Sequence, residues 1–265
     1  MSDGSVMSDD APELVQERHG PILTIRLNRP DARNALNGAL IAGIGAAFVE
    51  AESDPEIRVV VITGTGDRSF CAGMDLQAFA SGDGAGISSG AMEDYNRLLR
   101  GEIAVPVIGA ANASAVGGGL ELLLGCDLIV ASNEARFGFP EVKRGFFPAG
   151  GGTNIGTRVP LGIAFEMTLT GELIDAARAY EIGLLNAVVP PEEVMPTALA
   201  FAERIAECAP LGLAASKELV RLGVTDAVQA AARLEHWQTV VFQSEDAQEG
   251  ARAFVEKRKP VWRGV

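Results

Sequence analysis

Histidine and cysteine are scarce in this chain of 265 residues. The two histidines, His19 and His236, offer little material for a histidine-based metal site or a Ser-His-Asp triad. Three widely spaced cysteines without a CxxC pair argue against a disulfide framework and a zinc site, and they indicate a reducing compartment. We therefore expect a cytoplasmic protein that holds no metal.

Positive charge and long apolar runs are also in short supply. Lys and Arg number 22 against 35 Asp and Glu, which gives a formal net charge of −13. Such a charge argues against a nucleic-acid partner, and an anionic ligand would need a local basic cluster. No apolar run approaches transmembrane length, so we expect no membrane partner.

The length allows one large domain, or one domain with a smaller helical appendage. Residues 1–12 are acidic and rich in small side chains, unlike a signal peptide, and are predicted to form a disordered tail. A core of mixed strands and helices is expected over residues 13–195. Helical periodicity dominates the remainder, so residues 196–265 are expected to form a separate helical region.

Alternating strand and helix patterns predict an α/β core with right-handed crossovers. The expected strands cover residues 14–17 and 22–27, which form a hairpin, then 57–63, 107–111, 127–131 and a short stretch at 187–189. Residues 57–63 form an uninterrupted β-branched run, typical of a strand buried on both faces. One helix is expected to end near residue 52, and further helices are expected over about 92–103, 195–208, 211–222 and 226–241. The Gly- and Ser-rich residues 81–90 are predicted to be mobile.

The stretch from Val116 to Cys126 combines three successive glycines with one carboxylate in an apolar run. The glycines are expected to open a helix, and Glu121 then lies on its first turns. An unpaired carboxylate in such a run is expensive to bury, which favours a catalytic role for Glu121. The alternative is a helix packed closely under a strand, with Glu121 facing water.

Two loops that each follow a predicted buried strand are candidate ligand sites, residues 70–75 and 117–119. If these turns face one another, their backbone N–H groups can converge on one oxygen and form an oxyanion hole. Phosphate binding is the competing interpretation of the glycines. It is disfavoured because the chain has neither a G-x-G-x-x-G nor a Walker motif.

A second carboxylate, Glu141, follows Phe137 and Phe139 in a predicted loop. Alone it is more readily explained as a surface charge, but together with Glu121 it would form an acid/base pair. Cys71 adjoins the first of the two loops. Without a recognisable histidine partner, a structural thiol is favoured over a nucleophile.

These motifs together resemble the enoyl-CoA hydratase/isomerase (crotonase) superfamily, most closely its enoyl-CoA hydratases. The matching segments are 27–30 with 34–37, 70–76, 117–121 with 126–127, 137–141, 148–153, 169–171 and 249–258, in the family's order from about residue 14 to 262. The resemblance implies an α/β fold, in which residues 13–195 form a catalytic core built as a spiral of ββα turns. Residues 196–265 would then be the C-terminal helical oligomerisation region, which forms trimers in this family. The resemblance also implies a homotrimer or a dimer of trimers, that is, a hexamer.

By the same resemblance, the backbone N–H groups of Met74 and Gly118 would form the oxyanion hole, with Glu121 and Glu141 as catalytic carboxyls. Residues implied in binding the substrate or its CoA moiety are Arg33, Ala35, Ala72, Gly73, Asp75, Leu76, Gly117, Phe254 and Lys257. Because CoA carries several phosphate charges, Lys143, Arg144, Arg258 and Lys259 are further candidate cations. The equal alternative for each of these cations, and for Arg33, is an ordinary solvated charge. The chain departs from the family at Asn154-Ile155, where Gln-Arg is common, and at the bulky Phe146-Phe147, which leaves the acyl group open.

The implied reaction is reversible addition of water to a 2-enoyl-CoA thioester, with coenzyme A as part of the substrate and no separate cofactor. The presence of both glutamates favours hydration, because many superfamily members with other chemistry lack one of them. Double-bond isomerisation or another thioester-enolate reaction is the enzymatic alternative. A non-catalytic CoA-ester- or RNA-binding relative is the other, and the negative charge and both glutamates argue against it.

Overall fold

The computed structural model describes residues 11–82 and 87–265. Most of the predicted disordered tail, residues 1–10, and residues 83–86 of the predicted mobile stretch therefore lie outside the described part of the chain. The ends of that stretch are helical: Ser81 ends one helix and Ser89 begins the next. The stretch predicted to be mobile therefore overlaps the end of one helix and the start of the next.

The larger of the two sheets has six strands, in the order β1-β2-β3-β4-β6-β9. Its strands are β1 Leu14–His19, β2 Ile22–Leu27, β3 Val59–Gly64, β4 Val107–Ala111, β6 Leu128–Ser132 and β9 Ala187–Val189. The β1–β2 hairpin is antiparallel, and every other pair is parallel. The α/β class expected from the alternating pattern is confirmed.

A smaller sheet, β5-β7-β8, explains how the chain winds. Its strands are β5 Ala115–Val116, β7 Arg136–Gly138 and β8 Ile174–Asp175, and isolated parallel bridges Leu36–Met74 and Cys71–Ala115 extend the same pattern. The chain passes from β4 to β5, through α4 (Gly118–Gly125), and back to β6 and β7. One strand in each sheet followed by a helix is one ββα turn, so the spiral fold implied by the resemblance is confirmed.

Both faces of β3 are buried, as its β-branched run predicted. Val60 and Ile62 belong to the larger core, which also contains side chains of helices α1 (Gly38–Ser53), α3 (Ser89–Leu99) and α4. Val59 and Val61 face the opposite side and pack with helix α7 (Val194–Ala206). The sheet is thus covered by helices on both faces, which is the usual arrangement of a parallel sheet.

Shorter helices carry the loops around the sheets. They are α2 Leu76–Ser81, α5 Leu161–Thr170, α6 Ala176–Glu181 and the 3₁₀ turns η1 Pro30–Ala32, η3 Pro140–Arg144, η4 Gly152–Thr157 and η5 Pro191–Glu193. No helix within residues 11–82 and 87–265 is long and apolar enough to cross a membrane.

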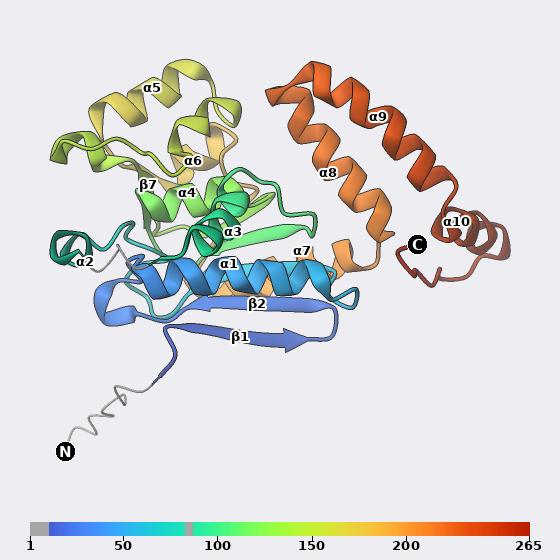
Figure 1. The fold of residues 1–265 in the computed structure, drawn as a ribbon. Coiled ribbons are helices and arrows are strands. Elements are labelled where there is room, and N and C mark those ends of the chain that lie inside the picture. The colour runs from blue at the N-terminus through green and yellow to red at the C-terminus, as the bar shows by residue number, and fades with distance from the viewer. Residues whose placement is uncertain (1–10, 83–86) are drawn as a thin grey trace.

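The last helices are α8 Pro210–Thr225, α9 Ala227–Phe242 and α10 Glu245–Glu256. Helices α8 and α9 form a pair that extends away from the sheet, and α10 lies beyond it (Figure 1). Only Ala215 of α8 is buried, and α9 buries no residue within this chain. Helix α7 spans the predicted boundary at residue 196 and packs against the large sheet. The helices that lie away from the sheet therefore begin with α8.

Two cations of α8, Lys217 and Arg221, attach this helix to the carboxyl end of α4. Lys217 Nζ lies 2.7 Å from Asp127 Oδ2 and donates to the Val105 carbonyl at 2.9 Å. Arg221 also contacts Asp127, at 3.3 Å. Burial lowers the pKa of Lys217, and the Asp127 carboxylate opposes that effect. Asp127 is therefore the counter-charge that allows a lysine with a 9% exposed side chain to stay ionised.

Replacing Asp127 by Ala should destabilise the fold strongly, because it leaves buried Lys217 without its carboxylate. We expect the free energy of unfolding to fall by about 3–5 kcal/mol, measured by urea denaturation at a fixed protein concentration. Glu181→Ala, which breaks an exposed ion pair with Arg178, is the control and should cost about 0.5 kcal/mol or less. Equal losses in the two variants would contradict this account.

Candidate active site

An isolated bridge between Leu36 and Met74 sets the direction of the first predicted donor. Leu36 N–H donates to the Gly73 carbonyl at 2.8 Å, and the Leu36 carbonyl accepts from Asp75 N–H at 2.9 Å. In a parallel bridge these two bonds flank the central residue, whose own N–H then points away from the partner. Among the described residues, no group accepts a hydrogen bond from Met74 N–H.

The second predicted donor lies beside the first. Gly118 is the first residue of α4, so its N–H has no acceptor within the helix. A Cβ atom placed on Gly118 would lie 3.6 Å from the Met74 nitrogen, and one placed on Gly73 would lie 3.1 Å from the Gly118 nitrogen. A Cβ on Gly119 would overlap the Cys71 carbonyl oxygen. The glycines therefore let the two main chains touch, which brings the two N–H groups together.

Glu121 is buried and only 7% exposed, so it does not face water as the alternative interpretation proposed. Its Oε1 accepts a hydrogen bond from Gly152 N–H at 2.9 Å. Burial is the main cause that raises the pKa of Glu121, and the charge of Glu141 raises it further, while the Gly152 N–H acts in the opposite direction. The Gly152 donor, at the start of η4, was not predicted.

Glu141 lies in η3 and is half-buried, so it is not the plain surface charge that its loop position suggested. A Cβ atom on Gly117 would stand 2.7 Å from Glu141 Oε1, and Gly117 itself has φ +57°. The positive φ favours glycine at this position. Glu141 Oε2 is buried and accepts no hydrogen bond within the described residues. Burial raises the pKa of Glu141, against smaller effects of its own backbone N–H and Arg144.

Both carboxyl groups thus border the first turn of α4. The Gly117 carbonyl accepts from Glu121 N–H at 3.0 Å, and the Glu141 carboxyl packs against Gly117. The first turn of α4 therefore carries the free Gly118 N–H and the Glu121 carboxyl, and the Glu141 carboxyl packs against the start of the same turn. This arrangement offers two hydrogen-bond donors for an anionic oxygen and two acids of raised pKa beside them.

Other reactive groups near this turn have structural environments. Burial raises the pKa of Cys71 to about 12, which keeps the thiol protonated and favours a structural role. Tyr95 of α3 is buried, and burial is the main cause that raises its pKa. The charge of Glu121 raises the pKa further, which places Tyr95 near the site. Within the described ranges, no three His, Cys, Asp or Glu side chains gather to hold a metal ion.

Most of the residues implied in binding the CoA moiety lie on two adjoining segments, 33–36 and 72–76. Ala72 N–H donates to the Arg33 carbonyl at 3.1 Å, next to the Leu36–Met74 bridge. The contact between these segments brings together six of the predicted binding residues: Arg33, Ala35, Ala72, Gly73, Asp75 and Leu76. A seventh, Gly117, adjoins Gly73. The Asp75 side chain is already occupied, because it caps α2 by accepting from Gln77 and Ala78 N–H.

The candidate cations differ in their surroundings. Lys143 pairs with Glu172, Arg258 with Glu249 and Lys259 with Glu207, and Arg144 contacts the Pro140 carbonyl. Arg33 and Lys257 form no ion pair with any described residue. The structure does not bring Phe254 and Lys257 to the glutamates within one chain, because α10 lies beyond α8 from α4, the helix that carries Glu121 (Figure 1).

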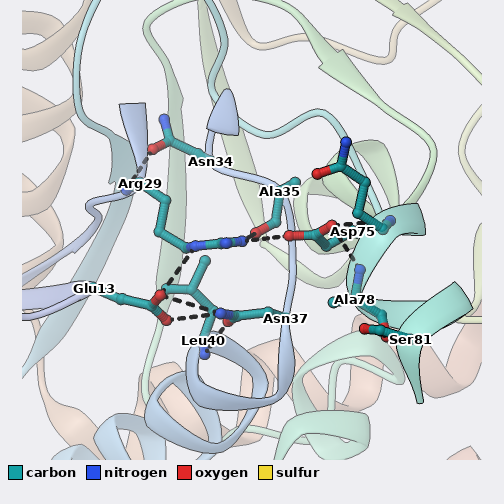
Figure 2. A network of polar contacts seen from close by, with 10 residues as sticks. Glu13, Arg29, Asn34, Ala35, Asn37, Leu40, Asp75, Ala78 and Ser81 are labelled. Carbon is teal, nitrogen blue, oxygen red and sulfur yellow. Dashed lines mark hydrogen bonds and ion pairs between the residues drawn. The ribbon is translucent and has the colours of Figure 1, made fainter. Parts of the chain in front are cut away.

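Sequence reasoning missed a polar network beside the Met74 segment (Figure 2). The Arg29 guanidinium contacts Glu13 at 3.1 Å, the Ala35 carbonyl at 2.6 Å and Asp75 at 2.9 Å. Arg29 lies in one of the motifs that carried the resemblance, segment 27–30, but the motif gave no role for its side chain. The partners come from separate loops, so no sequence spacing marks them.

Comparisons with known proteins agree with this geometry. The sequence profile of the enoyl-CoA hydratase/isomerase family matches residues 17–265, and the chain belongs to that family, within the crotonase superfamily. It is 40% identical over 256 residues to the carnitinyl-CoA dehydratase of Salmonella enteritidis PT4, covering 93% of this chain and 97% of the relative.

Two solved structures cover 96% of this chain and 100% of their own. An enoyl-CoA hydratase from Mycobacterium tuberculosis H37Rv superposes with a TM-score of 0.89 at 38% identity. A carnitinyl-CoA hydratase from Mycobacterium avium superposes with a TM-score of 0.74 at 43% identity. The chain is thus an enzyme of the crotonase family, a hydratase or dehydratase of CoA thioesters.

The raised pKa of Glu121 has a consequence for stability. The folded protein holds this proton to higher pH than the unfolded chain, so the contribution of Glu121 is present below the ordinary glutamate pKa and is lost as pH rises through the raised value. Glutamine does not titrate. We therefore expect the free energy of unfolding of the wild type, minus that of Glu121→Gln, to fall from about pH 4 to pH 8, as measured by urea denaturation. A difference that rises with pH would contradict the raised pKa.

Proposed function

We propose that this protein catalyses the reversible addition of water to a 2-enoyl-CoA thioester, giving a 3-hydroxyacyl-CoA. One observation carries the proposal. The turn at Gly117 brings two unpaired backbone N–H groups, those of Met74 and Gly118, beside two carboxyls of raised pKa, Glu121 and Glu141.

The two N–H groups would bind the thioester carbonyl oxygen. A thioester carbonyl is weakly stabilised by resonance, so addition at C3 generates an enolate whose charge collects on this oxygen. Donors fixed before the reaction stabilise that charge as it develops, and the positive end of α4 at Gly118 adds to their effect. The bridge to Leu36 keeps Met74 N–H free for this use.

The two carboxyls would share the proton transfers. One accepts a proton from the attacking water as its oxygen bonds to C3, and the other delivers a proton to C2. By the family resemblance Glu141 is the donor at C2, and the buried, unpaired Glu141 Oε2 is an oxygen available to the water or substrate. Proton transfer between the neighbouring carboxyls then restores the starting state, so the net reaction adds one water.

The CoA moiety would lie along segments 33–36 and 72–76, with Arg33 as a cation near its phosphates. Met74, Phe79 and Phe146 are exposed apolar side chains near the site, and the Phe79 and Phe146 rings meet edge to face with centroids 5.9 Å apart. These rings join α2, just after Met74, to the loop after Glu141. They would form a wall of the acyl pocket, as their place between the two catalytic segments suggests.

A panel of CoA esters tests this proposal. It should contain 2-enoyl-CoA thioesters from short to long chains for hydration, and carnitinyl-CoA for dehydration because relatives carry that name. We expect turnover of at least one ester with the addition or loss of water. Exchange of the C2 hydrogen with solvent without any hydrated product would instead support isomerase or other enolate chemistry. Tight binding of esters without turnover would support a non-catalytic protein.

Glu141→Gln should separate catalysis from binding, because it keeps the shape of the side chain and removes its proton. We expect kcat to fall by about 10²–10⁴-fold, with the affinity for the CoA ester retained. Glu172→Gln, at an exposed glutamate paired with Lys143, is the control and should keep full activity. The double variant with Glu121→Gln should lose much less than the product of the single losses. A Glu141→Gln enzyme with most of its activity would remove Glu141 from the mechanism.

We also propose that the protein assembles as a homotrimer or a dimer of trimers through its last helices. Helix α9 buries no residue within the chain. The exposed apolar residues of α8, α9 and α10 include Val220, Val224, Val228, Leu234, Phe242, Phe254 and Val255. Helices that leave this much apolar surface uncovered fit a closed symmetric oligomer. Phe254 and Lys257 would then reach the CoA site of a neighbouring subunit.

Deleting residues 246–265 should reduce both the oligomeric order and the affinity for CoA esters. Sedimentation velocity measures the first effect and ligand titration the second. Circular dichroism verifies that the shortened chain is folded. A full-length protein that sediments as a fully active monomer at micromolar concentration would contradict the proposal and leave α10 as an intramolecular cover.

A further inference from the structure

We propose that Arg29 is a positioning residue for the reaction, which acts by clamping the Leu36–Met74 bridge and so aiming the Met74 N–H. This inference rests on the proposed function, because it assigns the Met74 N–H to the oxyanion hole. Its basis is a contact visible in Figure 2: a single guanidinium nitrogen, Arg29 Nη1, donates to two groups, the Ala35 carbonyl at 2.6 Å and Asp75 Oδ2 at 2.9 Å.

The position of these two acceptors is the first step of the argument. Ala35 directly precedes Leu36, and Asp75 directly follows Met74. The Arg29 nitrogen therefore ties together the two segments of the bridge one residue away from the bridge itself. The bridge is isolated and has only its two backbone hydrogen bonds, so a third link beside it limits how far the Met74 peptide can rotate.

The second step concerns Asp75, which connects the clamp to α2. Its Oδ1 accepts from Gln77 N–H at 3.2 Å and Ala78 N–H at 3.1 Å, while Oδ2 faces Arg29. The Asp75 side chain is thus held at both oxygens. Together, the helix start after Met74 and the guanidinium fix the peptide units on the carboxyl side of Met74.

The third step is that Glu13 holds the Arg29 guanidinium on the side away from Ala35 and Asp75. Its Nε lies 3.1 Å from Glu13 Oε1, and Glu13 accepts from Asn37 Nδ2 at 2.9 Å. The Arg29 and Asp75 side chains are only 19% and 15% exposed. A planar guanidinium satisfies three partners in one arrangement, which a lysine ammonium on a flexible stem does not reproduce. None of these partners is a reacting group, so Arg29 acts through Met74.

Two variants test the clamp in the full-length enzyme. Arg29→Lys keeps the positive charge and loses the fork. Asp75→Asn keeps an oxygen that caps α2, since Asn is as good a cap as Asp, and loses the carboxylate that faces Arg29. Arg97→Lys is the matched control, because Arg97 binds Glu52 through two bonds of 2.7 and 3.0 Å between α3 and α1 and touches neither segment of the bridge.

Two readouts separate positioning from a general structural effect. The first is the division of the change between kcat and KM for the best ester of the panel. The second is the infrared stretching frequency of the thioester carbonyl, isotopically labelled, in the bound saturated analogue of that ester. Hydrogen bonds from an aligned oxyanion hole lower this frequency on binding. Loss of stability alone does not change it in molecules that remain folded.

For Arg29→Lys and Asp75→Asn we expect kcat to fall roughly 10- to 100-fold, as for a small misalignment of a catalytic group. KM should change by less than about threefold, and the carbonyl shift on binding should shrink. Arg97→Lys should lose a similar amount of thermal stability and keep both kcat and the wild-type carbonyl shift. If Arg29→Lys does not fold, Asp75→Asn decides the question, because it retains the α2 cap.

Three results would overturn the clamp. The first is a folded Asp75→Asn enzyme with wild-type kcat and carbonyl shift. The second is a rise of KM alone, which would assign Arg29 to CoA binding through Ala35 instead. The third is a wild-type enzyme that turns over esters without any carbonyl shift, because no oxyanion hole would then exist for Arg29 to aim. Failure of the proposed function is a separate result, the lack of turnover by the wild type across the whole panel.

Discussion

The contact between two bare main chains is the constraint on which the rest of this structure depends. The segment around Cys71 to Met74 and the start of α4 meet with no side chain between them, and at Gly119 even a methyl group would collide with the Cys71 carbonyl. Such closeness makes two neighbouring N–H groups available on one side. The Leu36 bridge, the Asp75 cap and the Arg29 network all act on the same segment from the other side.

The buried carboxyls show that the fold accepts a local cost at this place. Glu121 is 7% exposed, and the hydrogen bond from Gly152 N–H offsets only part of the effect of burial on its pKa. Glu141 keeps one buried oxygen without a donor among the described residues. Arrangements that lower stability without a structural gain are most readily explained by function. The surrounding cores, packed on both faces of the sheet, supply the stability that tolerates them.

Much of this architecture could be predicted from the sequence, because central strands of the large sheet are buried and one of them, over residues 59–62, is an uninterrupted β-branched run. Glu121 could be predicted because it stands alone among apolar neighbours. Glu141 could not be assigned from its surroundings alone, since a loop glutamate has no pattern that reveals burial. The strands of the small sheet have two or three residues, too few for any periodicity to appear. The role of the Arg29 side chain could not be predicted because its partners lie up to 46 residues away in the chain.

The attachment of α8 to the carboxyl end of α4 has a consequence for the order in which the enzyme is completed during synthesis. Arg221 reaches the Gly125 carbonyl across 96 residues of chain, and Lys217 joins it at Asp127. During translation, α4 is synthesised long before Lys217 and Arg221. The nascent chain can therefore form the spiral early, as domains generally fold from the N-terminal side. The far end of the helix that carries Gly118 and Glu121 gains its last partners only when most of the polypeptide has been made.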